Sequence, residues 1–423
     1  MAWMDNGPAW SRAARVAAWS VGASLLATTA FGWPVANDAN DVTIDGLAFK
    51  SMDGDSFAIA HVDVANTNLS KDEIVKLLTP DTPADDELAL ARKLKADKFA
   101  VPSIDVVGKD GSKIHLSGMT AGHIDGGKVE TLDIASVDAT GTDKGGPVAI
   151  KLGPLHLDGV DVARLLARDD PAAAALPPSR LIGLTVSGID VVAPDPGDAP
   201  GQSVHVGVGS IAVHNDYAGD SIEHGDTKIS GIVIEPSPGS EAGKALASFG
   251  YSKIELAMTV GVKYEADAKT FAFENFTVDG VEMGSVGLKA NFTDVAPTLF
   301  GADSGARMQA LLETGVASIE VKLVNNGLFD KALAYSAKQQ GVAPDALRAQ
   351  WSAMVGQTAP VLLGGSPSSL ALAAEAQKFV AVPKNLTVTV KAKSGALKAG
   401  DFMAISDPSD FVGKLDIAAA ANR

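Results

Sequence analysis

Residues 42–49 of the chain read Val-Thr-Ile-Asp-Gly-Leu-Ala-Phe. Apolar side chains stand four and two residues before Gly46, and then one and three residues after it. Alternation with a period of two is typical of a strand that buries one face, and here its phase changes at the glycine. An extra residue at Asp45-Gly46 restores the facing, so we predict a strand with a β-bulge, for which glycine supplies a positive φ. A hairpin turn is the alternative, because Asp-Gly is also a turn dipeptide.

Six copies of this pattern run through the chain, each with an apolar residue, Asp or Ser, glycine and a second apolar residue. Their glycines are Gly46, Gly118, Gly159, Gly188, Gly231 and Gly280. We favour the bulge over the turn because the apolar run resumes directly after the glycine. The spacing between copies is irregular, which argues against a rigid solenoid and favours a loose repeat of hairpins with insertions.

Helical patterns interrupt the strands and dominate the carboxyl third. The insertions predict helices at 71–78, 85–99 and 162–168, and the carboxyl third predicts helices at 328–340, 344–356 and 369–380. In the second of these carboxyl-terminal helices, Leu347, Trp351 and Met354 are spaced by four and three residues, as in one apolar stripe. We expect this stripe to be core rather than a partner-binding face.

These patterns together predict a mainly β fold of the α+β class. We expect an elongated antiparallel meander of bulged hairpin repeats, with helical insertions and a helical hairpin near the C-terminus. The predicted regions are a signal peptide or N-terminal anchor at 1–36, a repetitive β-rich body at 37–295 and an α+β region at 296–423.

The amino terminus has the pattern of an export signal. Arg12 and Arg15 precede an uncharged run over 16–36, which is rich in Ala, Gly, Ser and Thr. We favour a cleaved signal peptide, and hence a periplasmic or otherwise exported protein. An uncleaved inner-membrane anchor, through which the protein would contact the membrane, is one alternative. A buried N-terminal helix of a cytosolic protein is the other.

Composition excludes several classes of function. The chain of 423 residues carries 35 Lys and Arg against 51 Asp and Glu, a formal net charge of −16. Such a chain repels phosphate backbones, so we expect no nucleic-acid partner. Cysteine is absent, which excludes disulfides, thiolate chemistry and Cys-ligated zinc. Hydrophobic residues make up 46% of the chain, which excludes wholesale disorder.

The sequence offers no catalytic constellation, so we predict a protein that is not an enzyme and needs no cofactor. Gly54-Asp55-Ser56 and Gly219-Asp220-Ser221 resemble the start of a GDSL-type hydrolase block. Such enzymes need a later His as base, whereas the last His is His224, so we interpret both as turns. His205, His214 and His224 could converge on a hairpin, but they lack a matched carboxylate pattern, and we predict no metal site.

The clearest strand runs from Ile254 to Tyr264 and alternates strictly, and the next strand begins nearby. Hairpins with one apolar face must bury that face, either in a dry core or under an apolar ligand. The candidate wall of an apolar trough comprises Leu256, Met258, Val260, Val262, Phe271 and Phe273.

The export signal, the glycine-kinked strands over roughly 40–295 and the acidic, Cys-free composition resemble AsmA-type and YdgA-type bacterial envelope proteins. This resemblance implies a repetitive β body, anchored or exported, with a link to envelope lipid homeostasis. Our leading hypothesis is therefore a non-enzymatic cell-envelope protein that binds or shields an apolar ligand such as lipid. The alternatives are a structural or protein-interaction component of the periplasm, partnered by another envelope protein, and a hydrolase without a recognisable motif.

Overall fold

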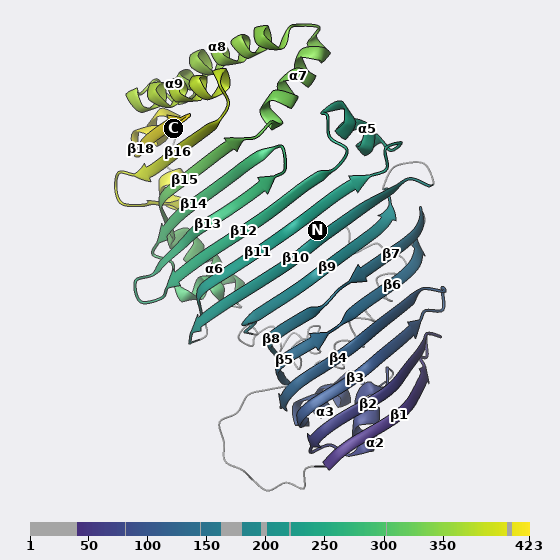
Figure 1. Cartoon of the computed structure of the whole chain (residues 1–423). Coiled ribbons are helices and arrows are strands. Elements are labelled where there is room, and N and C mark those ends of the chain that lie inside the picture. Colours follow the sequence, from purple (N-terminus) through teal and green to yellow (C-terminus); the bar gives the residue numbers. More distant parts are fainter. Residues whose placement is uncertain are drawn as a thin grey trace. The chain divides into compact units, whose positions relative to one another are not determined.

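The fold is that of a mainly β protein, as the sequence predicts. A computed structural model describes residues 40–80, 82–143, 145–161, 180–195, 201–219, 221–301, 303–403 and 408–423. Eighteen strands form a large antiparallel meander sheet, in which most strands pair with their neighbours along the chain (Figure 1). The chain divides into two compact units, and the boundary between them falls within strands β10 and β11. The first holds the described residues up to His214 with Ile234–Ser240, and the second holds Asn215–Val233 with Glu241–Arg423.

The first unit contains nine complete strands and two described helices. The strands are β1 (Asn40–Lys50), β2 (Ser56–Thr67), β3 (Lys95–Val107), β4 (Lys113–Asp125), β5 (Lys128–Ile134), β6 (Ser136–Asp143), β7 (Gly146–Leu152), β8 (Leu155–Asp161) and β9 (Gly183–Pro194). Helices α2 (Lys71–Leu78) and α3 (Ala84–Lys93) connect β2 to β3. β10 (Ser203–Ala218) and β11 (Ser221–Pro236) contribute residues to both units.

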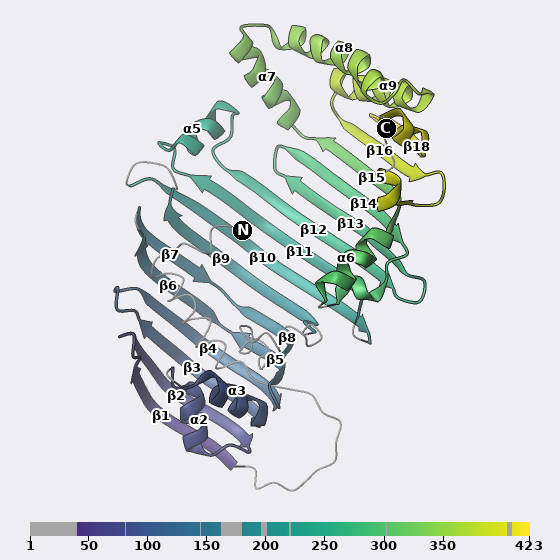
Figure 2. The same ribbon diagram turned by 180° about the vertical axis from the view of Figure 1, so that it is seen from behind.

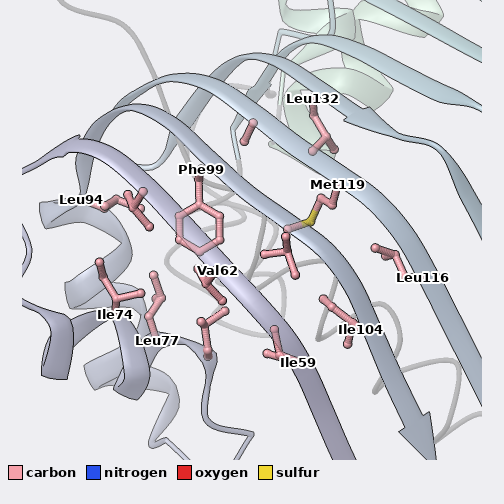
Figure 3. Close-up of a cluster of buried hydrophobic side chains, with 14 of the residues drawn as sticks. Ile59, Val62, Ile74, Leu77, Leu94, Phe99, Ile104, Leu116, Met119 and Leu132 are labelled. Carbon is pink, nitrogen blue, oxygen red and sulfur yellow. The ribbon is translucent and has the colours of Figure 1, made fainter. Parts of the chain in front are cut away.

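The core of the first unit lies between one sheet face and these two helices (Figure 3). Ile74 and Leu77 of α2 are buried against strand residues such as Val62, Phe99 and Met119. The amphipathic helices therefore cover the apolar face of the sheet, and the dry-core alternative describes this unit well.

Along the strands of this unit, the buried side chains switch repeatedly between odd-numbered and even-numbered positions, as the glycine pattern predicts. On β4 the buried residues are Ile114, Leu116, Met119, Ala121 and Ile124, so the steps are two, three, two and three. Five of the six pattern glycines, all except Gly280, have φ between 62° and 70°. A backbone in the left-handed region reverses the facing without interrupting the strand.

The geometry of these kinks differs from the predicted bulge, in which two residues oppose one. Val101 pairs with Met119 and Ser103 with Ser117, so Pro102 and Gly118 lie opposite each other and the register is unchanged. The partner strand thus changes facing at the same level. We call this line of matched kinks across the first unit the crease. Gly118 is needed there for space too, because an added Cβ would lie 2.6 Å from Cβ of Ala135.

The sixth copy of the pattern follows the turn alternative. Gly280 ends its strand and pairs with Gly284 across a tight turn, and Val281 is 58% exposed. The register shift of that strand lies earlier, between Phe273 and Phe276.

The second unit follows the strand pair β10 and β11 with seven further strands. The strands are β12 (Ile254–Glu265), β13 (Thr270–Gly280), β14 (Gly284–Thr293), β15 (Gly315–Asn325), β16 (Asn385–Ala392), β17 (Leu397–Lys398) and β18 (Leu415–Ala421). The helices are α5 (Glu241–Ser248), η2 (Pro297–Phe300), α6 (Ser304–Glu313), α7 (Leu328–Gln340), α8 (Pro344–Leu362), α9 (Pro367–Ala381), α10 (Ala399–Met403) and α11 (Pro408–Gly413).

The helices predicted within the described residues are present as helices, but some of them begin or end at other residues than predicted. α2 and α7 have the predicted bounds, α8 is longer, and α5 and α6 were not predicted. α3 ends at Lys93 rather than at 99, because Lys95 onward pairs with β4 and burial of Phe99 in the sheet outweighs helix propensity. In the α8 stripe, Leu347 and Trp351 join the core with Leu333, whereas Met354 is 55% exposed.

The predicted export segment and the helix predicted at 162–168 lie outside the described residues. Within the described part of the chain, no helix is both long enough and apolar enough to cross a membrane.

Candidate functional site

The six predicted trough residues lie on one face of two paired strands. Leu256, Met258, Val260 and Val262 alternate along β12, and Phe271 and Phe273 belong to β13. In the register, Val262 pairs with Phe273 and Tyr264 with Phe271. Side chains of directly paired residues point to the same side of a sheet, so the structure brings the six residues together.

This apolar face continues without interruption across the second unit. Phe273 pairs with Ala290, Ala290 with Ile319, Ile319 with Val390 and Val390 with Ile417. The parallel row runs through Phe276, Leu288, Val321, Val388 and Ala419. We define the apolar face as these two rows, the six trough residues, Val278, Val286, Leu323 and Phe292.

The members of the apolar face on β14 to β18 were not predicted, because neither the pairing of distant strands nor the register can be read from alternation alone. The sequence did contain one signal for these members, the alternation of Val286, Leu288, Ala290 and Phe292 on β14.

The apolar face is only partly shielded. All six trough residues are half-buried, and Val286 is 47% exposed. Core residues of the first unit such as Val62 are fully buried by comparison. In the described part of the second unit, α9 packs on β16 and β18 and α6 packs on η2 and α10, and no helix packs extensively along β12 to β14. Figure 2 shows the sheet from the side of α6, which crosses one end of these strands.

An aromatic cluster closes that end of the apolar face. The ring of Phe300, on η2, lies 4.9 Å from Tyr264 and 6.2 Å from Phe271, centroid to centroid. Phe292 lies 6.0 Å from Phe271 in the same way. The Tyr264 hydroxyl donates a hydrogen bond to the Val295 carbonyl oxygen at 3.1 Å, and burial raises the pKa of Tyr264. The hydroxyl group of Tyr264, the polar atom of this cluster, therefore has its hydrogen-bond partner within the protein.

The opposite face of the same strands is polar and ion-paired. Lys263 Nζ lies 2.6 Å from Glu265, and this hydrogen bond raises the pKa of Lys263. His224 lies on this side, 2.9 Å from Asp226. Both residues of the Lys263 pair also line an open hollow of about 490 Å³ at the strand ends. This hollow is polar, and it does not coincide with the centre of the apolar face.

No group of three or more His, Asp or Glu in the described residues is arranged to hold a metal ion. Gly54 lies in the turn between β1 and β2, as predicted, and Gly219 lies in a turn directly after β10, whereas Ser221 begins β11. His224, the last possible base, pairs with Asp226 instead.

The fold and this face thus define an antiparallel sheet protein with one partly uncovered apolar face. A family model described as "Uncharacterized protein" matches residues 277–422, which run from the end of β13 through β18 and include most of the apolar face. No curated protein matches the chain.

Proposed function

We propose that the protein is a non-enzymatic cell-envelope protein that binds or shields the acyl chains of lipids on the apolar face of its second unit. The observation that carries this proposal is the continuous set of half-buried apolar side chains on β12 to β16. Leaving such a surface in water is unfavourable, at about 25 cal/mol for each Å² of apolar area. An occupant without hydrogen-bonding groups suits this face, because its side chains offer no partners for them.

The dimensions of the face fit hydrocarbon chains. Eight residue steps separate Leu256 from Tyr264, which is roughly 26 Å at about 3.3 Å for each residue. A single leaflet of a bilayer is about 15 Å of hydrocarbon. Neighbouring strands lie about 4.8 Å apart, so β12 to β15 offer width for acyl chains side by side.

Export to the periplasm is part of the same proposal. Arg12, Arg15 and the apolar run over 16–36 support it, and the AsmA-type resemblance of 40–295 agrees with a role in envelope lipid homeostasis. Sequencing of the amino terminus of the purified protein tests whether the signal is cleaved.

The direct test is mass spectrometry of organic extracts from protein purified without detergent out of its native envelope. We expect stoichiometric lipid beside a control exported protein. Titration of the delipidated protein with a long-chain fatty acid that carries a terminal fluorophore should then show saturable binding. Met258→Glu places a charge in the middle of the face and should weaken this binding at least tenfold.

Thr259→Glu is the matched control, because Thr259 is the next residue of β12 and pairs with Thr277 on the polar face. Clean extracts together with equal probe binding by both variants would contradict the proposal.

A protein-interaction role is the second candidate, and one observation favours it. Apolar residues at the α8 to α9 junction are exposed, namely Val361 at 76%, Leu362 at 66% and Leu370 at 54%. Such a cluster is typical of an interface with another envelope protein. Crosslinking from position 362 in intact cells, with position 357 on the same helix as control, distinguishes this role from lipid binding.

A further inference from the structure

Four of the His residues on the polar face of the first unit lie beside carboxylates on neighbouring strands. The shortest contacts join Nδ1 of His61 to Asp45 at 2.5 Å and Nδ1 of His115 to Asp105 at 2.7 Å. The other two contacts join Nδ1 of His156 to Asp133 at 2.7 Å and Nε2 of His205 to Asp190 at 2.8 Å. Each pair therefore joins two adjacent strands by side chains as well as by the backbone.

Two of these His residues lie between two carboxylates. Nε2 of His61 also contacts Asp63 at 2.8 Å, and Nε2 of His156 contacts Asp158 at 3.0 Å. Ionised carboxylates only accept hydrogen bonds, and a neutral imidazole has only one N–H to donate. Both contacts are hydrogen bonds only when the ring carries two N–H groups, so this geometry fits the imidazolium.

The remaining two belong to a row of charges that crosses the unit. In the register, Asp105 pairs with His115, His115 with Asp138, Asp138 with Lys151 and Lys151 with Asp190. The row ends at His205, whose second nitrogen lies 3.9 Å from Glu235 on β11. With protonated His residues the charges alternate in sign along the row, whereas with neutral ones the carboxylates outnumber Lys151.

We propose that His61 and His156, set beside the row of charges that includes His115 and His205, form a pH-responsive brace of the first unit. In mildly acidic solution the imidazolium rings of His61 and His156 tie β1 to β2 and β5 to β8. In alkaline solution the ties lose their charge, and neighbouring carboxylates repel each other. This proposal is independent of lipid binding, because it concerns polar side chains of the first unit, whereas the apolar face belongs to the second.

The direction of the effect follows from linkage. The hydrogen bonds that His61 and His156 donate to Asp45 and Asp133, respectively, raise the pKa values of the two His residues above the usual 6.5. A group whose pKa is higher in the folded state stabilises that state fully below its unfolded pKa. The contribution is then lost as the pH rises through the folded pKa. The hydrogen bond from His61, the hydrogen bond from Thr43 and the positive charge of Lys98 on β3 lower the pKa of Asp63, so this carboxylate stays ionised across this range.

The experiment is hydrogen exchange of the full chain followed by mass spectrometry, at pH 5.5 and pH 8.5, with intrinsic exchange rates divided out. All chains compared, including the reference called wild type here, carry Glu87→Gln, because burial raises the pKa of Glu87 on α3 to about 7 and would add a pH dependence of its own. For peptides from β1 to β8 we expect higher protection at pH 5.5, by about twofold to fivefold for each bridge, as exposed ion pairs provide. The double variant His61→Gln with His156→Gln keeps a donor on each side chain but removes the charge, and should lose most of this difference.

His123→Asn is the control, because His123 makes no ion pair within the described residues and its φ of 52° suits Asn. It should keep the wild-type difference. Asp45→Asn with Asp133→Asn removes the carboxylate side instead, and should reproduce the loss seen with the His variants. Equal protection of the wild type at the two pH values, or a difference that both double variants retain, would overturn the proposal.

Discussion

The core of the first unit includes a buried carboxyl group, that of Glu87. Glu87 on α3 is 2% exposed, and its Oε1 atom has no hydrogen-bond partner in the described part of the chain. Burial raises the pKa of Glu87 to about 7. An acid whose pKa is raised on folding destabilises the folded state above its unfolded pKa, because its charge must be buried. The residue therefore makes the first unit more stable as the pH falls from 7 toward 4.5.

Replacing this carboxyl tests that reading. Glu87→Gln should raise the free energy of unfolding at pH 8 by about 3 kcal/mol, because each unit of pKa difference between the folded and unfolded states represents about 1.4 kcal/mol. The gain should shrink as the pH is lowered and disappear near pH 4.5. Urea unfolding at several pH values measures it, with exposed Asp86→Asn as the control. A pH-independent effect would contradict the assignment.

Two glycines of the crease have nearly the same φ but different surroundings. Gly46 has φ of 65° with nothing within 4 Å of an added Cβ, whereas Gly118 has φ of 62° and the close approach to Ala135. Gly46→Ala should therefore cost about 1 kcal/mol for the left-handed backbone alone. Gly118→Ala should cost about 1–3 kcal/mol more, because Ala135 must move. Urea midpoints that fall equally would show that steric contact at the crease is unimportant.

At the scale of elements, local sequence signals predicted which helices and strands exist better than they predicted where these elements end or which strands pair. Ser70 and Glu73 form a capping box at the start of α2, so its beginning could be read from the sequence. The end of α3 could not, because pairing of β3 with β4 sets it. The glycine pattern predicted the changes of facing, but a single strand carries no information about the kink of its neighbour. For the same reason the trough residues were predicted on β12 and β13, and the continuation of the face onto β16 and β18 was not.

The cap of α2 makes a prediction at this scale. The hydrogen bond with Lys93, and those with Ser70, lower the pKa of Glu73 to about 2. The stabilisation that Glu73 provides is thus present above pH 4.5 and is lost as the pH falls toward 2. Ser70→Ala should lower stability by about 1 kcal/mol at pH 7, and Glu73→Gln, which keeps a capping oxygen, should cost less. Circular dichroism during urea unfolding compares the two, and a larger loss with Glu73→Gln would show that the ion pair outweighs the cap.

At the scale of the whole molecule, net charge and exposed apolar surface act against each other. The net charge of −16 keeps copies of the chain apart at pH 7, and the sequence pI of about 4.8 marks where this repulsion ends. The apolar face and the α8 to α9 junction are the surfaces on which copies can then associate.

Light scattering should therefore rise as the pH approaches 4.8 in delipidated protein. Val286→Thr replaces an exposed apolar side chain of the face and should reduce the scattering without lowering the unfolding midpoint. Ser285→Thr, the preceding residue and on the other face, should leave it unchanged. If both variants aggregate like the wild type, the apolar face does not drive the association.

The matched kinks of the crease also bear on how such a chain changes length. A bulge on one strand alone shifts the register of everything beyond it, so an added hairpin would turn its apolar side chains the wrong way. At Pro102 and Gly118 both strands of a pair switch their buried positions at the same level, so the register is unchanged. The next strand can then pair with this edge and place its apolar side chains on the same face. Duplication or loss of a whole hairpin then leaves the remaining strands paired as before. The irregular spacing of the glycine pattern is what such modular growth would leave in a sequence.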